Sequence, residues 1–173
     1  MGAGAGYSTE LIARCVGPTG SVYGQVDEES EKLRARMMMP VMSNVTVLVR
    51  PSDDPVPYDL HDLDLITFYF AYHDRTYMGI DRAKMNRALF AALKPGGFLV
   101  IADHSARSED GATVGKTFHR IAEQTLRSEV EAAGFKFAAD AQFLRHPEDA
   151  RTNIVFRSPT PVDEFVLKFQ KPM

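Results

Sequence analysis

The sequence predicts an α/β fold, in which helices cover a mainly parallel sheet and the end of the chain adds an antiparallel strand. Short apolar segments rich in β-branched residues alternate with helical segments along most of the chain, which is typical of a parallel sheet covered on both faces. Two apolar segments then follow in succession near the end, which favours an antiparallel strand at the edge of the sheet. A run of glycines opens the chain, and such folds bind ligands at turns of this kind.

The length and composition are those of one globular domain. The chain has 173 residues, of which 45% are hydrophobic and 25% are charged. A chain of this length buries enough apolar surface to fold without disulfides or metals. We therefore expect residues 1–173 to form a single domain.

The first third of the chain contains two predicted helices and two predicted strands. The expected elements are a helix over 8–16, a strand over Val22–Val26, a helix over Glu28–Met39, a strand over Val45–Val49 and a loop over Pro51–Pro57. The second helix stops before Pro40, because the residue before a proline avoids the helical region. The second strand is β-branched and apolar throughout, as in a buried strand.

The middle of the chain continues the alternation. Met85, Leu89 and Leu93 recur every four residues, which predicts a helix with one apolar face. The expected elements are a strand over Leu63–Phe70, a helix over Ile80–Leu93, a helix stop at Lys94–Gly97 and a strand over Phe98–Ala102.

A long helix and two strands complete the predicted fold. An apolar stripe made of Phe118, Ile121, Leu126 and Val130 predicts one helix over about 114–133, and Gly134 is suited to its C-terminal cap. The final expected elements are strands over Lys136–Leu144 and Phe165–Gln170.

Charge and cysteine content limit the classes of partner. The net charge of −3 gives no electrostatic reason to bind nucleic acid or an anionic membrane, and no apolar run approaches the length of a membrane span. Cys15 is the single cysteine, which excludes an intramolecular disulfide and a cysteine metal cage. We therefore expect a cytoplasmic protein whose partner is a small molecule, without nucleic acid, a membrane or a bound metal.

The opening glycine run predicts a ligand-binding turn. Gly2, Gly4 and Gly6 are spaced G-x-G-x-G and precede a predicted helix, whose free N–H groups favour a phosphate or a carboxylate. The dinucleotide pattern G-x-G-x-x-G is one residue longer, which disfavours a nicotinamide or flavin cofactor. A flexible glycine-rich tail is the alternative interpretation of the run.

Over nearly its whole length, the chain resembles class I S-adenosylmethionine-dependent methyltransferases. The matching segments are Gly2–Thr9, which resembles the family's first motif, Leu93–Ile101, Glu131–Phe135 and Asp163–Phe169. Phe70–Asp74, Asp103–Ala106 and His119–Ile121 further resemble a bacterial subgroup known mainly as predicted methyltransferases. The resemblance implies a three-layer Rossmann-like fold and S-adenosyl-L-methionine as the cofactor.

The resemblance also implies the cofactor-binding residues. They are Gly2, Ala3, Gly4 and Gly6 in the turn, Gln25 and Asp27 for the ribose hydroxyls, Asp53 and Asp54 for the adenine amino group, and Tyr72 in a later loop. For Asp27, the alternative is a solvated first turn of the following helix, where the dipole favours acids. For the acids at 53 and 54, the alternative is a solvated turn between Pro51 and Pro55.

The sequence departs from the family before the glycine turn. The family places a central strand ahead of this turn, whereas Met1 directly precedes Gly2 here. We therefore expect an N-terminally truncated sheet, and an exposed sheet edge of this kind favours homo-oligomers. Two functions remain open: methyl transfer to a small molecule, and a degenerate protein of the same fold that binds a ligand or partner without catalysis.

Two histidines are the candidate catalytic bases. His73 and His104 each lie beside an aspartate, on predicted loops that follow neighbouring strands. Histidine titrates near neutral pH, so either residue is suited to take a proton from a hydroxyl or amine acceptor. His119 is expected within the long helix, in a surface pair with Glu123. A metal site built from His73, Asp103 and His104 is conceivable, but no spacing demands it.

Overall fold

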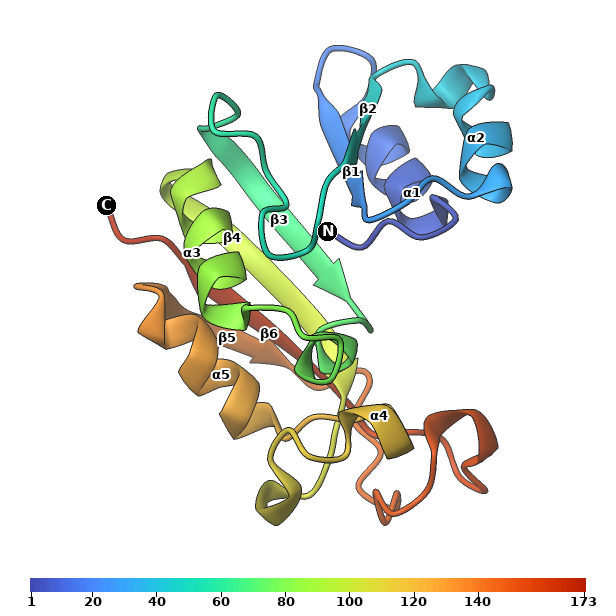
Figure 1. Ribbon diagram of the computed structural model, residues 1–173, viewed down its shortest axis with the longest axis vertical. Coiled ribbons are helices and arrows are strands. Elements are labelled where there is room, and N and C mark those ends of the chain that lie inside the picture. The colour runs from blue at the N-terminus through green and yellow to red at the C-terminus, as the bar shows by residue number, and fades with distance from the viewer. The chain divides into compact units, whose positions relative to one another are not determined.

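The computed structural model describes residues 1–173, and the chain forms two compact units (Figure 1). Unit 1 comprises Met1–Pro57 and unit 2 comprises Tyr58–Met173. Each unit has its own sheet and is described by itself. The expectation of a single domain stays a prediction.

Unit 1 contains a two-stranded parallel sheet and two helices. Strand β1 (Val22–Val26) pairs with β2 (Val45–Val49), and the bounds of both strands agree with those predicted. Helix α1 (Tyr7–Val16) precedes β1, and α2 (Glu31–Met37) lies between the two strands. A small core forms where Ala13, Val22 and Met42 meet, with Ile12, Met37, Val41 and Val45 packed against it.

Helix α2 is shorter than predicted. It begins only after Ser30, whose hydroxyl accepts a hydrogen bond from the N–H of Leu33 at 3.1 Å. A serine in this position satisfies an N–H group that has no partner within the helix, so it fixes where the helix starts. Residues 27–30 therefore lie outside the helix.

Unit 2 contains a four-stranded mixed sheet in the order β3-β4-β6-β5. The strands are β3 (Leu63–Tyr69), β4 (Leu93–His104), β5 (Lys136–Ala141) and β6 (Glu164–Gln170). β3 pairs parallel with β4, whereas β6 pairs antiparallel with both β4 and β5. The antiparallel strand was predicted, but it lies between two other strands and not at the edge. Strand β5 is the edge strand instead.

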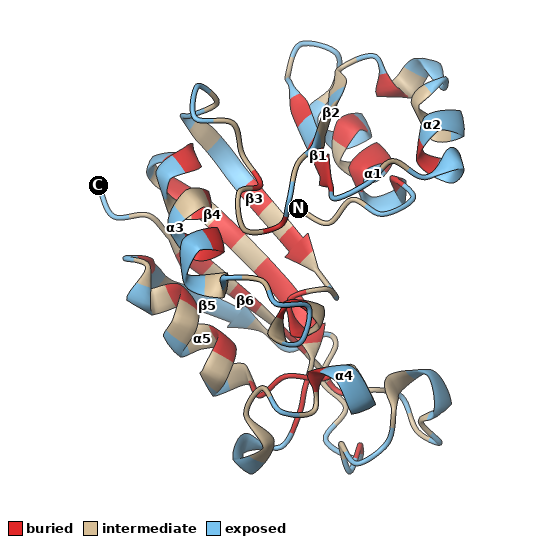
Figure 2. Cartoon of the chain, viewed as in Figure 1, coloured by how far each residue is buried: buried red, intermediate tan, exposed pale blue.

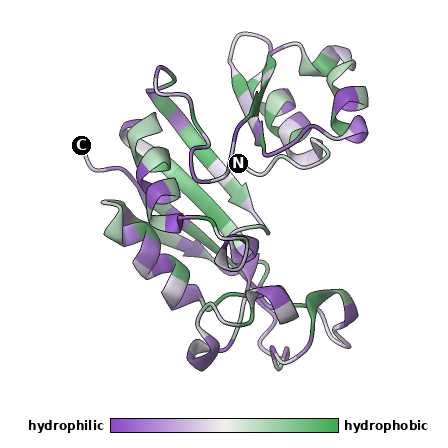
Figure 3. Ribbon diagram, viewed as in Figure 1, coloured by the Kyte–Doolittle hydropathy of each residue, from purple (hydrophilic) through white to green (hydrophobic).

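Two helices cover one face of this sheet. Helix α3 (Arg82–Ala92) and helix α5 (Glu123–Ala132) lie side by side on the sheet, and their buried residues face it (Figure 2). In Figure 3 the green apolar colour runs along much of the central strand β4. The fully buried residues of the sheet include Phe68 of β3, Leu99 and Ile101 of β4, and Leu167 and Phe169 of β6. No helix of the structure has the length and apolarity that a membrane crossing requires.

Strand β4 begins earlier than predicted. Lys94–Gly97 was expected to be a helix stop outside the sheet, but it lies within the strand. Its backbone pairs with the end of the chain: the Gly96 N–H donates to the Lys171 carbonyl, and the Lys171 N–H donates to the Gly97 carbonyl, each at 2.9 Å. Gly97 lies so close to Leu63 that a Cβ there would stand 3.0 Å from the Leu63 carbonyl oxygen. The glycine pair therefore allows an irregular strand to pack closely.

The predicted long helix over 114–133 is broken into two. Helix α4 (Gly115–Phe118) ends at His119, which has a left-handed backbone with φ 55°, and α5 starts only at Glu123. Between them, the Ile121 N–H donates to the His104 carbonyl at 3.0 Å and the Ala106 N–H donates to the Ile121 carbonyl at 2.9 Å. This segment therefore pairs with the end of β4, and His119 does not lie in a helix with Glu123.

Candidate functional site

The glycine run in unit 1 is an ordered turn, not a flexible tail. Gly2, Gly4 and Gly6 have φ values of 66°, 53° and 82°, a backbone region that residues with a Cβ rarely adopt. The Ala3 N–H donates to the Gln25 carbonyl at 2.8 Å, which ties the turn to the end of β1. Helix α1 begins directly after Gly6, and no side chain caps it.

Gln25 holds the turn in place through its side-chain amide. Its Oε1 accepts a hydrogen bond from the Gly2 N–H at 3.1 Å, and its Nε2 donates to the Arg50 carbonyl at 2.7 Å. The residue is 4% exposed. Both ends of the amide are therefore engaged by backbone groups. Gln25 thus braces the turn against the end of β2, and its ribose contact stays a prediction.

Glu10, a buried acid of α1, supports the same turn through an arginine. Glu10 pairs with Arg14 and with Arg36, and the Arg36 Nε donates to the Ala5 carbonyl at 3.1 Å. The hydrogen bond from Arg14 and the neighbouring Arg36 lower the pKa of Glu10, although burial works in the opposite direction. Glu10 is therefore ionised at neutral pH and holds the arginine that contacts the turn.

Replacing Gly6 with alanine is expected to destabilise the protein by about 1–3 kcal/mol. The left-handed backbone disfavours a Cβ, and that Cβ would stand 2.8 Å from Leu33 Cδ1. Urea unfolding measures the loss. Gly4→Ala is the matched control, because Gly4 also has a positive φ but no atom lies within 4 Å of its added Cβ. Equal losses in both variants would contradict the proposed steric contact.

Asp27 is an exposed carboxylate held by a buried hydroxyl. The Ser52 Oγ lies 2.9 Å and 3.0 Å from the two carboxylate oxygens, and Ser52 itself is fully buried. Because α2 starts at Glu31, Asp27 lies outside the helix, so a solvated first helical turn is not its environment. No local sequence pattern indicates the supporting role of Ser52, which depends on the ends of β1 and β2 lying side by side.

The two acids after β2 have different surroundings. Asp54 forms an ion pair with Arg50, and the Arg50 Nε also donates to the Asp54 carbonyl at 2.9 Å. The Asp54 carboxylate is thus already engaged within its own turn. Asp53 is half-buried. An adenine contact by either acid stays a prediction, with Asp53 ahead of Asp54.

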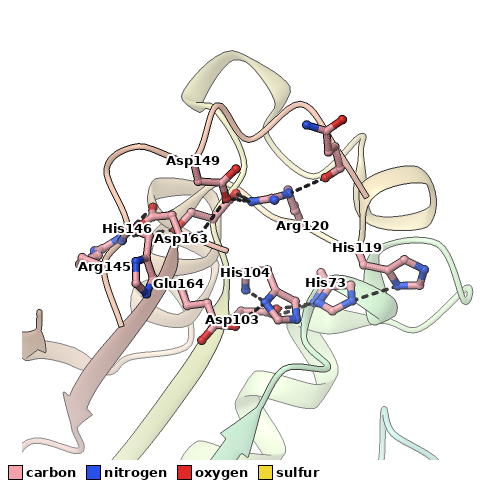
Figure 4. A network of polar contacts seen from close by, with 12 residues as sticks. His73, Asp103, His104, His119, Arg120, Arg145, His146, Asp149, Asp163 and Glu164 are labelled. Carbon is pink, nitrogen blue, oxygen red and sulfur yellow. Dashed lines mark hydrogen bonds and ion pairs between the residues drawn. The ribbon is translucent and has the colours of Figure 1, made fainter. Parts of the chain in front are cut away.

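The second group of predicted residues lies in unit 2, at the ends of β3 and β4 (Figure 4). Phe70 directly follows β3 and has φ 53°, which is rare for a bulky residue. Its N–H donates to the Ala102 carbonyl at 2.8 Å, and its ring stacks on His104 with centroids 5.0 Å apart. The strained residue therefore turns the chain at the strand end and supports a candidate base.

His73 is buried and held by Asp103. The Nδ1 of His73 lies 2.6 Å from Asp103 Oδ1, and the His73 N–H donates to Asp103 Oδ2 at 2.8 Å. His73 is 3% exposed and Asp103 is fully buried. The aspartate therefore fixes the orientation of the imidazole and leaves its Nε2 pointing the other way.

His119 and Asp74 occupy that other side. The sequence had indicated Asp74 only as the acid beside His73, and had placed His119 on the surface of a long helix. The Nδ1 of His119 lies 3.3 Å from His73 Nε2 and 3.4 Å from Asp74 Oδ1. Asp74 Oδ1 also lies 3.2 Å from His73 Nε2. Glu123, the predicted partner of His119, forms an ion pair with Arg145 instead. The break between α4 and α5 is what brings His119 to this cluster.

His104 faces a different set of groups. Its Nδ1 lies 2.9 Å from Glu164 Oε1, and its N–H donates to Asp103 Oδ1 at 2.8 Å. Its ring is within 5.6 Å of the His73 ring, centroid to centroid. The structure thus brings the two predicted histidines together, but only His104 has a ring nitrogen, Nε2, that no neighbouring group engages.

Tyr72 is a packing residue of unit 2. It is fully buried, and its hydroxyl donates to Glu129 Oε2 and accepts from Asn86 Nδ2, each at 2.8 Å. Burial and the charge of Glu129 raise its pKa, so the hydroxyl stays protonated as a donor. Arg82 binds the same carboxylate with two hydrogen bonds. Tyr72 therefore contributes to the packing of unit 2, and a cofactor contact by it stays a prediction.

Arg120 and Asp149 form a buried ion pair in unit 2, next to the strand end that carries His104. Arg120 and Asp149 are 0% and 1% exposed in their side chains, and Arg120 Nη1 lies 2.7 Å from Asp149 Oδ2. Arg120 also donates to the carbonyls of Ser105 and Asn153 (Figure 4). Burial favours a raised pKa for Asp149, but hydrogen bonds from the Asp163 and Arg151 N–H groups and from Arg120 outweigh it and lower the pKa.

Comparison with known proteins identifies the fold. No family model matches the chain. Among solved structures, an S-adenosylmethionine-dependent methyltransferase from Aquifex aeolicus has a TM-score of 0.71 and 18% identity, over 98% of this chain and 79% of that chain. The [4+2]-cyclase SpnF has a TM-score of 0.69 and 15% identity, over 99% of this chain and 73% of its own.

A third similar structure contains two bound small molecules. The 1,6-didemethyltoxoflavin-N1-methyltransferase of Burkholderia thailandensis, solved with bound 1,6-didemethyltoxoflavin and S-adenosylhomocysteine, has a TM-score of 0.65 and 16% identity, over 99% of this chain and 69% of that chain. These similarities show that the chain has the α/β Rossmann-like fold of S-adenosylmethionine-dependent methyltransferases. At such identities they show the fold alone, because one fold carries many functions.

Proposed function

We propose that the protein is an S-adenosylmethionine-dependent methyltransferase that acts on a small molecule. The observation that carries this proposal is the glycine turn of unit 1, which is tied to β1 and followed directly by α1. The methyltransferase fold supports it. The net charge of −3 favours a small acceptor over nucleic acid, and a cytoplasmic location is part of the same proposal.

The residues of unit 1 fit S-adenosylmethionine. No atom lies within 4 Å of the position that a Cβ on Gly4 would occupy, so a ligand can approach the backbone there. The uncapped N-terminus of α1 favours the carboxylate of the amino-acid part. Asp27 presents an exposed carboxylate, which can accept hydrogen bonds from both ribose hydroxyls. When bound, the cofactor supplies an electrophilic methyl group on a sulfonium.

In unit 2, His104 is proposed as the group that takes a proton from the acceptor. Glu164 lies at its Nδ1 and Phe70 stacks on its ring, so the imidazole is oriented while Nε2 remains available. His73 was an equal candidate on sequence, but its two ring nitrogens face Asp103 on one side and Asp74 and His119 on the other. His104 is therefore the preferred base for a hydroxyl or amine acceptor.

A second candidate function is ligand binding without methyl transfer. The observation that favours it is Gln25, whose amide oxygen and nitrogen each bond to a backbone group where a second ribose acceptor was expected. SpnF has the same fold and is a [4+2]-cyclase, so the fold does not require methyl transfer as its reaction. The bacterial subgroup, the truncated sheet and self-association stay predictions.

Calorimetric titration with S-adenosylmethionine and S-adenosylhomocysteine tests the proposal. We expect one site for each ligand, and Asp27→Asn should weaken binding by about tenfold or more, since hydrogen bonds to charged groups contribute about 1.5–3 kcal/mol. Glu28→Gln is the matched control, because it removes a neighbouring exposed acid. If the wild type binds neither ligand, both methyl transfer and cofactor binding without turnover are contradicted. Binding without turnover on any hydroxyl or amine acceptor would favour the second function.

A further inference from the structure

Three ligand-type atoms meet at one point in unit 2. They are His73 Nε2, Asp74 Oδ1 and His119 Nδ1. The distances between them are 3.2 Å from His73 to Asp74, 3.3 Å from His73 to His119, and 3.4 Å from His119 to Asp74. The three atoms thus form a nearly equilateral triangle.

The size of this triangle matches the face of a metal tetrahedron. A tetrahedral zinc site with bonds of about 2.0–2.1 Å has neighbouring ligand atoms about 3.3–3.4 Å apart. Two imidazole nitrogens and one carboxylate oxygen are ligands of the type that zinc takes in catalytic sites. We propose that His73, Asp74 and His119 bind one Zn²⁺ ion, with a fourth position left for water or another small oxygen ligand.

The groups around the triangle orient it as they do in metal sites. Asp103 accepts a hydrogen bond at His73 Nδ1, at 2.6 Å, which leaves the lone pair of His73 on Nε2, toward the proposed ion. A carboxylate behind a ligating histidine fixes the tautomer and strengthens the ligand. On the other side, the Tyr77 hydroxyl donates to Asp74 Oδ1 at 2.8 Å. Neighbouring side chains therefore hold two of the three ligands in position.

The backbone brings the third ligand to the other two. His73 and Asp74 lie in one 3₁₀ helix, His73–Thr76, and α4 packs closely against it. Gly115 allows this close approach, since a Cβ there would stand 2.7 Å from the His73 carbonyl oxygen. The left-handed backbone of His119 then ends α4, and its ring lies edge-on to His73 (Figure 4). A strained residue at such a point is typical of a functional site.

Burial gives the site a closed side and an open side. His73 is 3% exposed in its side chain, whereas Asp74 and His119 are 28% and 25% exposed. Solvent thus reaches the two outer ligands but not the inner one. Phe156 packs against the His119 ring, with centroids 5.1 Å apart. A three-ligand site that is reachable from one side is the arrangement of zinc sites that keep an open coordination position.

Metal binding to the chelator-treated full chain tests this inference without any cofactor. Calorimetry with ZnCl₂ should give one site per chain, and MgCl₂ should give none, because Mg²⁺ prefers oxygen ligands. Cobalt(II) in place of zinc should produce the intense visible absorption of tetrahedral coordination. Because the readout is the metal alone, the proposed methyl transfer can fail while the zinc site stands, and the reverse also holds.

Two substitutions identify the ligands. His119→Gly removes one imidazole and suits the left-handed backbone, and Asp74→Asn removes one carboxylate; each should weaken zinc binding at least tenfold. His61→Ala is the control, since His61 is exposed and lies outside the cluster, and its affinity should equal that of the wild type. No zinc binding by the wild type would leave only a hydrogen-bonded cluster and overturn the proposal. Unchanged affinity in both ligand variants would overturn it as well.

Discussion

Asp149→Ala is expected to lower the free energy of unfolding by about 3–5 kcal/mol, because it leaves the charge of Arg120 buried without a partner. The Arg120 side chain is fully buried, so water cannot replace the lost carboxylate. The same substitution removes the acceptor of the Asp163 N–H at 2.8 Å and of the Arg151 N–H at 2.9 Å. Unfolding in urea, followed by circular dichroism, measures the change.

A double variant distinguishes the orphaned charge from lost packing. Arg120→Met with Asp149→Leu removes both charges while keeping apolar volume, and replacing a buried pair in this way is often neutral. We expect the double variant to be more stable than Asp149→Ala alone. If the double variant loses more stability than the single one, the buried charge is not the cause.

Acid titration gives a second readout of the same pair. The folded-state pKa of Asp149 is lowered, so its contribution to stability is complete above the unfolded value of about 3.9 and is lost as the pH falls through the lower folded value. Stability of the wild type should therefore decline more steeply below about pH 4 than that of Asp149→Asn. Parallel declines would show that Asp149 does not contribute to acid unfolding.

His104→Gln is expected to lower kcat by about 10²–10⁴-fold on the acceptor that the protein methylates, which is the range for loss of a general base. Formation of S-adenosylhomocysteine measures turnover. The affinity for S-adenosylmethionine should stay unchanged, because His104 is proposed to act on the acceptor and not on the cofactor. The physical reason is that glutamine keeps a polar side chain of similar reach but cannot take up a proton at neutral pH.

A control on the same chain separates proton transfer from general damage. His146→Gln changes a half-exposed histidine whose Nδ1 faces Glu148. Its kcat should equal that of the wild type. Glu164→Gln should lower kcat less than His104→Gln, since Glu164 orients the ring but does not take the proton. Unchanged turnover in His104→Gln would remove this histidine from the mechanism.

The elements that depend on local pattern were predictable. Strands Val22–Val26 and Val45–Val49 have the predicted bounds, because a short run of β-branched apolar residues suits a buried strand whatever surrounds it. The start of β4 was not predictable from the residues around it. Lys94–Gly97 has the composition of a turn, and it belongs to the strand only because Lys171, far along the chain, pairs with it.

The candidate site was predicted only in part, because some of its residues are placed by contacts between distant parts of the chain. His73 and His104 follow strand ends, so the fold class alone places them near one another. His119 was missed, because the helix that was expected to contain it is broken where Ile121 pairs with the end of β4. The break is also held by Arg120, whose buried partner Asp149 lies 29 residues away in sequence. No local pattern carries that information.

Phe70 and His119 each combine a strained backbone with a side chain that has a proposed role in a site. Both have a left-handed backbone, which costs a residue with a Cβ roughly 1–2 kcal/mol. Glycine at either position would relieve that strain, yet it would remove the ring that stacks on His104 or the imidazole beside His73. Selection for heat resistance and selection for activity should therefore enrich opposite residues at positions 70 and 119.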